Sequence, residues 1–188
     1  MSNAVIARLL VAGLLVLYPI LVYFGLRVLP PSFFGLLLIV LILPRLIAIK
    51  SAQRLFAAPV TIILVYAVAA TIAGSTQALL YYPAVVNLVL GTIFAGSLLG
   101  PEPLLLRVVR SRGMTLSEHA PFYLRRLTGV WAAFFALNCV VAIWTTTRSM
   151  EVWTIYNGFI SYLLIAALVG VEWLYRRRFK RLHGVSIS

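Results

Sequence analysis

Two long apolar runs in the second half of the sequence constrain its fold more than any other feature. The first follows Arg125 and Arg126, the second begins at Trp153, and a short polar turn, in which Arg148 can pair with Glu151, joins them. Each run is about 20 residues long, which matches the hydrocarbon thickness of a bilayer. Charged residues stand only at or near the ends of the runs. The stretch therefore predicts a transmembrane hairpin.

The composition extends this interpretation to the whole chain, because 63% of its 188 residues are hydrophobic. A water-soluble domain carries a much larger polar share. We expect an all-α fold, namely a polytopic transmembrane helical bundle with six spans in three hairpins. The expected single domain covers residues 1–188, with spans at 9–28, 32–49, 58–74, 83–100, 127–145 and 153–174, a loop at 101–126 and a basic tail at 175–188.

The basic residues predict the orientation of these spans. The net charge is +12, and of the 16 Lys and Arg residues only Arg27 and Arg148 fall on the opposite side from the others in a six-span arrangement. Lys and Arg accumulate on the cytoplasmic side of membrane proteins, so both termini are expected in the cytoplasm.

The same clusters of basic residues predict the partners. They lie beside apolar runs, which favours anionic lipid headgroups and gives no indication of nucleic acid. The expected anionic-lipid contacts are Arg107, Arg110, Arg112, Arg125, Arg126, Arg176, Arg177 and Arg178.

The second expected span leaves an alternative open. It is interrupted by Pro44 and Arg45, and its uninterrupted apolar core at 33–43 is short. A full crossing is favoured because Lys50 and Arg54 make the next loop basic. The alternative is a re-entrant segment.

Two further segments carry weaker signals. After Glu102 and Pro103, arginines and apolar residues could separate onto two faces of a short helix at the membrane surface, or the segment could be a solvated connector. In the fourth span, Gly91 and Ala95, like Gly96 and Gly100, are spaced to let helix backbones pack closely.

Three asparagines stand out because polar side chains inside a membrane are costly unless they are paired or face a cavity. Asn87, Asn138 and Asn157 should lie at similar depth in the outer half of the bilayer. We expect them to line an outward-facing ligand or lipid pocket together with Tyr82, Trp144, Trp153 and Tyr156. The alternative is helix-to-helix hydrogen bonding among the asparagines plus an ordinary belt of interfacial aromatic residues.

The sequence lacks the motifs of catalytic, phosphate-binding and metal-binding sites. It has no aspartate, no phosphate-binding glycine loop, and a single cysteine, Cys139, far from His119 and His183. Such a set builds neither a zinc site nor a nucleophile with its base. We expect no enzymatic activity, no metal and no cofactor.

Several stretches together resemble the bacterial intracellular septation protein A family along most of the chain. They are the Tyr18-Pro19 run at 18–24, the loop at 102–116, the Trp131 region at 127–138, and Trp153 with the following aromatic and glycine-containing segment. The family often shows a Trp, Asn, Phe, Lys pattern at this last place, where this chain has Thr154, Ile155 and Asn157.

The resemblance implies a multi-pass protein of the bacterial inner membrane. It further implies a non-enzymatic factor in cell-envelope maintenance or division that acts through lipids or other envelope proteins. The alternative is a carrier, or an accessory subunit of a carrier, for a lipid or hydrophobic metabolite that uses the asparagine and aromatic pocket. A lipid site between the fourth, fifth and sixth spans would favour the carrier, and a solid core would favour the partner-binding factor.

Overall fold

The computed structural model describes residues 13, 17–47, 57–111, 113 and 120–183. Within these residues the chain is helical and contains no strand, which confirms the all-α prediction. The elements are a helix at 17–25, α2 (Pro31–Ile47), α3 (Ala57–Ala73), α4 (Thr76–Leu80), α5 (Tyr82–Ser97), α6 (Leu104–Ser111), α7 (Ala120–Thr145), α8 (Met150–Ile155), the π-helical turn η2 (Tyr156–Ile160) and α9 (Ser161–His183).

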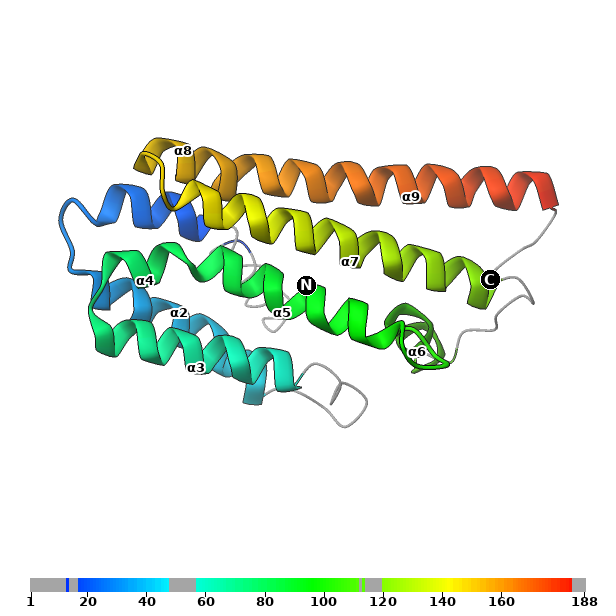
Figure 1. Cartoon of the computed structure of the whole chain (residues 1–188), viewed down its shortest axis with the longest axis horizontal. Helices are drawn as coiled ribbons and strands as arrows, with labels where there is room; N and C mark the ends of the chain where they lie inside the picture. Colours follow the sequence, from blue (N-terminus) through cyan, green and yellow to red (C-terminus); the bar gives the residue numbers. More distant parts are fainter. Residues whose placement is uncertain (1–12, 14–16, 48–56, 112, 114–119, 184–188) are drawn as a thin grey trace, which may run out of the picture.

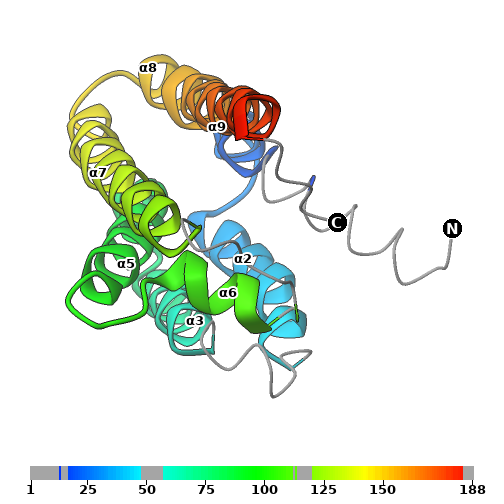
Figure 2. The same cartoon turned by 90° about the vertical axis from the view of Figure 1, so that its right-hand side faces the viewer.

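The longer helices run side by side along one axis of the molecule (Figure 1). Seen from the end, α9, α7, α5, α3 and α2 follow one another in an arc (Figure 2). The short helix α6 lies at the end of the bundle where α5 ends and α7 begins (Figure 1). The arc brings α5, α7 and the last helix together, which positions the site described below.

Several helix boundaries differ from the predicted spans. Helix α7 begins at Ala120, so Arg125 and Arg126 lie within a helix and the predicted loop at 101–126 is shorter. The last helix continues to His183 through residues expected to form a tail. Helix α2 passes through Pro44 without a break in its described part. Predicted residues 9–12, 14–16, 48 and 49 lie outside the described residues.

The uncharged tip between the third and fourth spans is also more ordered than its sequence suggests. Gly74 ends α3 with a φ of 58°, a backbone region that glycine adopts without a Cβ penalty. The Ser75 side chain then accepts the backbone N–H of Ala78 as an N-cap. The result is the extra helical turn α4.

Helices α2 and α3 pack more closely than α5 packs on its neighbours at the small-residue positions that the sequence predicted. A Cβ added at Gly35 would lie 2.9 Å from the Cα of Thr71, so the two backbones meet where one side chain is missing. Gly91 touches Phe135, as the prediction of close packing expects, but a Cβ at Gly96 would meet open space. Gly96 therefore takes no part in close packing among the described residues.

Helices α5 and α7 are joined along their whole length. Near one end the Cys139 thiol donates to the carbonyl of Ala84 at 3.4 Å. In the middle, Phe94 packs against Phe135 with ring centroids 5.3 Å apart. At the other end the Arg125 guanidinium donates to backbone carbonyls of the segment that follows α5. This antiparallel pair is the rigid wall of the bundle.

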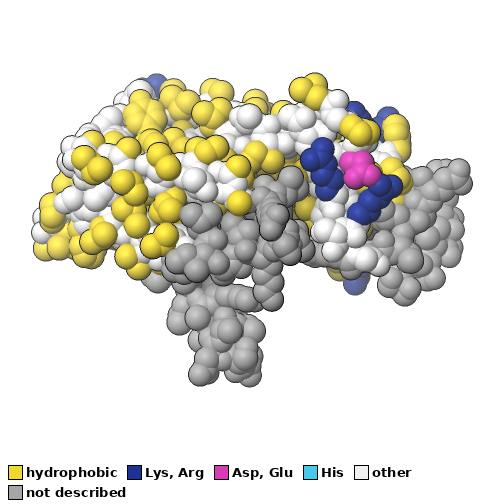
Figure 3. Space-filling view, turned by 90° about the horizontal axis from the view of Figure 1, so that it is seen from below, with side chains coloured by type: hydrophobic (Ala, Val, Ile, Leu, Met, Phe, Trp, Pro, Cys, Tyr) yellow, Lys and Arg dark blue, Asp and Glu magenta, His cyan; other side chains and the backbone are white. Residues whose placement is uncertain are grey.

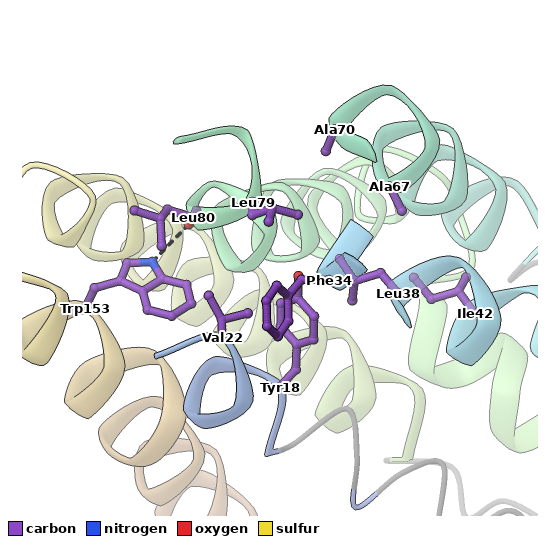
Figure 4. Close-up of a cluster of buried hydrophobic side chains, with 10 residues drawn as sticks. All are labelled: Tyr18, Val22, Phe34, Leu38, Ile42, Ala67, Ala70, Leu79, Leu80 and Trp153. Carbon is purple, nitrogen blue, oxygen red and sulfur yellow. Dashed lines mark hydrogen bonds between the residues drawn. The ribbon is translucent and has the colours of Figure 1, made fainter. Parts of the chain in front are cut away.

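An apolar cluster fills the space between the helix at 17–25, α2, α3, α4 and α8 (Figure 4). Its largest side chain, Trp153, is 1% exposed and donates its indole N–H to the Leu80 carbonyl at 2.9 Å. The cluster consists of Tyr18, Val22, Phe34, Leu38, Ile42, Ala67, Ala70, Leu79, Leu80 and Trp153.

Two helices in the described part are long and apolar enough to cross a membrane, Ala120–Thr145 and Met150–Leu174. Only 33% of the most apolar window of the first, and 11% of that of the second, is buried against the rest of the chain. Apolar side chains also cover much of the face seen in Figure 3, where most of the charged side chains gather at one end.

Candidate functional site

A directed chain of side-chain hydrogen bonds crosses from the last helix to α5. The Tyr156 hydroxyl donates to Oδ1 of Asn138 at 2.6 Å. Nδ2 of Asn138 donates to Oδ1 of Asn87 at 2.8 Å, and Nδ2 of Asn87 donates to the Pro83 carbonyl at 2.7 Å. Asn87 and Asn138 are nearly buried, so these bonds offset the cost of removing two amides from water.

Asn157 is held separately, at the junction of α7 and α8. Its Nδ2 donates to Oγ1 of Thr145 at 3.0 Å and to the backbone carbonyl of Trp153 at 2.9 Å. Thr145 in turn donates its hydroxyl to the Ala142 carbonyl. Asn157 thus ties the last helix to α7 through its amide nitrogen.

All three asparagines line one pocket between α5, α7 and the η2–α9 segment. The pocket has a volume of about 230 Å³ and is partly open to the outside. Polar atoms come from the asparagines, two tyrosines and one serine, and the rest of the wall is apolar. The residues that line it are Pro19, Tyr82, Pro83, Val86, Asn87, Leu90, Phe135, Asn138, Asn157, Ser161, Tyr162 and Ile165.

A π-helical turn carries Asn157 at the pocket and is followed by the wall residues of α9. The N–H of Ser161 bonds to the carbonyl of Tyr156, five residues earlier, and the Ser161 hydroxyl donates to the carbonyl of Asn157 at 3.2 Å. Gly158 allows the helix at 17–25 to approach, because a Cβ there would lie 3.3 Å from Ile20 and 3.4 Å from Pro19. Single π turns inside α-helices often occur at functional sites.

The predicted site residues divide into three groups. Asn87, Asn138, Asn157 and Tyr82 line the pocket, and its occupation by a lipid or another ligand stays a prediction. Tyr156 lies behind the wall as the donor to Asn138.

The two tryptophans lie elsewhere. Trp153 belongs to the apolar cluster, where its indole N–H donates to the Leu80 carbonyl. Trp144 is 48% exposed, and the guanidinium of Arg148 stacks on its ring at 4.6 Å. The expected pairing of Arg148 with Glu151 is replaced by this cation–π contact.

Two polar residues of the wall, Ser161 and Tyr162, were missed by the sequence analysis. Ser161 lies four positions after Asn157, a spacing that places both on one helix face and was available as a signal. Tyr162 follows the π turn in the chain and lies in the same wall. No pattern in the sequence predicts that turn.

The arginines expected to contact anionic lipid are engaged within the chain wherever their side chains are described. Arg125 donates to the carbonyls of Leu98 and Gly100, and Arg107 to that of Glu102. These contacts satisfy backbone carbonyls in the segment between α5 and α6.

The remaining arginines of that set make other contacts. Arg110 forms an ion pair with Glu102, Arg126 stacks on Phe122 at 4.4 Å, and Arg177 stacks on Trp173 at 3.7 Å. The side chains of Arg112, Arg176 and Arg178 lie outside the described part.

A smaller polar group occupies the opposite end of the bundle. Arg27 donates to the Tyr23 hydroxyl at 3.1 Å, and that hydroxyl donates to Glu151 at 3.4 Å. Hydrogen bonds from its own backbone amide and from Ser149 hold the pKa of the Glu151 carboxyl below its usual value. Arg27 and Arg148 lie at the end of the bundle opposite to Arg107 and Arg125 (Figure 1), and the side of a membrane on which each group lies stays a prediction.

Comparisons with protein-family models, with curated proteins and with solved structures found no match to this chain.

Proposed function

We propose that this chain is a six-span membrane protein, with both termini in the cytoplasm of a bacterium, that binds an amphipathic lipid in the asparagine pocket. It serves as a carrier, or as an accessory subunit of a carrier, for that lipid. The observation that carries the proposal is the convergence of Asn87, Asn138 and Asn157 on one pocket inside an otherwise apolar bundle.

The exposed apolar surface supports membrane embedding. The core helix of a soluble protein is mostly buried, whereas the window within Met150–Leu174 is only 11% buried. Leu163 on α9 is 58% exposed and Val65 on α3 is 63% exposed, so the apolar surface extends beyond the last hairpin. Surface of this extent in contact with water would cause aggregation, and lipid tails remove that cost.

The position of the pocket supports lipid binding over a purely structural role for the asparagines. It lies between α5, α7 and the last helix, which correspond to the expected fourth, fifth and sixth spans. A solid core at this place would favour a partner-binding factor. The open volume of about 230 Å³ accepts a headgroup while the chains remain among the apolar residues outside.

A second candidate function is a factor in envelope maintenance or division that acts through lipids or protein partners. It rests on the resemblance of residues 18–24, 102–116 and 127–138 to the septation protein A family. The two functions are compatible, because a lipid site can serve an envelope factor as well as a carrier. We place the carrier first because the pocket is a feature of this chain itself.

Native mass spectrometry tests the proposal, on protein extracted gently from its own membrane and with lipidomics of what stays bound. We expect one lipid per chain in the parent protein and none in Val86→Trp, whose indole fills the pocket. Val140→Trp is the matched control, because Val140 is 66% exposed on α7 and does not line the pocket. Equal lipid occupancy in both variants would contradict the proposal.

The asparagine variants separate binding from packing. Asn87→Leu and Asn157→Leu should fold and lose the lipid if the amides serve the ligand. Loss of folded protein in both variants would mean that the asparagines serve only as interhelical hydrogen-bonding groups.

A further inference from the structure

The orientation of each amide in the pocket is determined by its partners. A backbone carbonyl only accepts hydrogen bonds, so the side-chain atom that faces it must be a nitrogen. The Trp153 carbonyl therefore fixes Nδ2 of Asn157 on the protein side. The Pro83 carbonyl fixes Asn87 in the same way, and the orientation of Asn138 follows from that of Asn87.

Two polar atoms of the wall are left over after these bonds are assigned. Oδ1 of Asn157 accepts no hydrogen bond from the part of the chain that the structure describes, and the Tyr82 hydroxyl makes none there either. Neither atom is fully enclosed, because the Tyr18 hydroxyl is the only described side-chain polar atom that is fully enclosed without a partner. Nδ2 of Asn87 and Nδ2 of Asn138 each keep a second N–H as well. Oδ1 of Asn157 is therefore the acceptor, and the Tyr82 hydroxyl the donor, that has no bond at all within the described residues.

The pocket carries no formal charge among the described residues that line it. An ionised group placed there would lose its hydration without gaining a counter-ion, which strongly disfavours it in surroundings of low dielectric constant. The described arginines are held at the ends of the bundle by Glu102, by backbone carbonyls or by aromatic rings. The group that enters the pocket is therefore uncharged.

The size of the pocket further restricts the class of ligand that can bind. A volume of about 230 Å³ corresponds to roughly eight water molecules at about 30 Å³ each. This is room for a small polar head and the first carbons of a chain. A bulky phospholipid head does not fit, and the rest of the lipid chain remains outside the pocket.

We propose that the lipid bound in the pocket is an uncharged one whose head is a free hydroxyl group, such as a diacylglycerol or an isoprenoid alcohol. The lipid hydroxyl accepts a hydrogen bond from Tyr82 and donates one to Oδ1 of Asn157. Its chain leaves the pocket past the apolar side chains of Val86 and Ile165. The inference rests on the proposed function, since it names the lipid class that the asparagine pocket takes.

The test is a titration of the purified full-length protein in detergent, followed by native mass spectrometry. The probes are dioleoylglycerol, a polyprenol, and dioleoyl phosphatidic acid, which has the chains of the first probe and a charged phosphate in place of its hydroxyl. We expect one equivalent of dioleoylglycerol or of the polyprenol to bind at least tenfold more tightly than phosphatidic acid. The two neutral probes identify which kind of hydroxyl lipid the pocket prefers.

Two tyrosine variants test where the hydroxyl group of the lipid lies in the pocket. Tyr82→Phe keeps the ring that packs on Tyr18 and removes only the donor, so it should weaken the neutral lipid about 3- to 10-fold, as expected for one neutral hydrogen bond. Tyr18→Phe is the control, because its hydroxyl lies outside the pocket and its loss should leave the affinity unchanged.

The outcomes separate this inference from the proposed function. If phosphatidic acid binds as tightly as dioleoylglycerol and Val86→Trp abolishes its binding, the pocket is a lipid site and the inference about charge is wrong. If Tyr82→Phe leaves the affinity of the neutral lipid unchanged, the assigned position of the hydroxyl is wrong. If Val86→Trp changes the binding of no probe, the proposed function itself fails.

Discussion

The apolar cluster and the asparagine pocket are built from successive turns of the same helix. Trp153 enters the cluster and is 1% exposed, while Asn157, one turn later, lies in the pocket wall. In the cluster the indole N–H has one partner, the Leu80 carbonyl, and no other bond to make. In the pocket Asn157 uses its amide nitrogen for the fold and keeps its oxygen open.

In the membrane setting that we propose, the difference teaches how a chain separates stability from binding. Lipid tails are as apolar as leucine, so helices associate through close packing and interhelical hydrogen bonds. The cluster supplies the close packing. The interhelical hydrogen bonds are those from Tyr156 to Asn138 and from Asn138 to Asn87. Polar atoms that take part in neither packing nor interhelical hydrogen bonds can form hydrogen bonds with a ligand.

The largest expected effect lies in the apolar cluster. Trp153→Ala leaves a cavity and an unpaired Leu80 carbonyl, so the free energy of unfolding in detergent should fall by about 3 kcal/mol or more. Trp144→Ala, which removes a half-exposed ring, should cost under about 1 kcal/mol. Chemical denaturation of both variants measures this. Equal costs for the two tryptophans would mean that the cluster is not the packed core of the bundle.

Gly35→Ala should come next, because its Cβ would meet the α3 backbone at Thr71. Separation of α2 from α3 should lower the free energy of unfolding by about 2 kcal/mol, the usual cost of an overpacked contact. Gly96→Ala has open space and should be neutral, or stabilising by up to about 1 kcal/mol through helix propensity. A thermal unfolding series checks the pair, and a stable Gly35→Ala protein would show that α2 and α3 do not touch there.

The hydrogen-bond chain should contribute less than the cluster. A double-mutant cycle of Asn87→Leu and Asn138→Leu should give a coupling energy of about 1 kcal/mol, as found for polar pairs between membrane helices. Thr92→Val serves as the control partner for Asn138→Leu, since Thr92 bonds only to the Leu88 carbonyl of its own helix. A coupling near zero between the asparagines would leave both of them available to the ligand.

Tyr18→Phe should have the smallest effect and the opposite sign. The Tyr18 hydroxyl is buried without a partner, so its removal should stabilise the protein by about 1 kcal/mol. Tyr66→Phe deletes a hydroxyl that donates to the Ala78 carbonyl and should destabilise it by a similar amount. Melting temperatures of the two variants should move in opposite directions. A destabilised Tyr18→Phe protein would indicate that this hydroxyl has a partner in the membrane.

Part of the candidate site could be read from residue order. Asn87, Asn138 and Asn157 were expected together because each is a polar residue in the outer half of an expected span, and they line one pocket. Trp144 and Trp153 were expected there on the same ground, and depth alone could not place them. Depth says how far along a helix a residue lies and leaves its direction around the helix open.

The sequence by itself determined the helical character of the chain and which of its ends carry charge. In the lipid environment that we propose, long apolar runs must satisfy their backbone groups by internal hydrogen bonds, and it is costly to draw arginines near their ends inward.

Only the tertiary structure decided which face each helix presents. It turned Trp153 toward Leu80, placed the π turn against Pro19, and brought α2 onto α3 at Gly35. These outcomes depend on contacts between residues far apart in the chain. Since lipid tails are as apolar as the helix surfaces, these outcomes follow from side-chain shape and from the positions of a few hydrogen bonds.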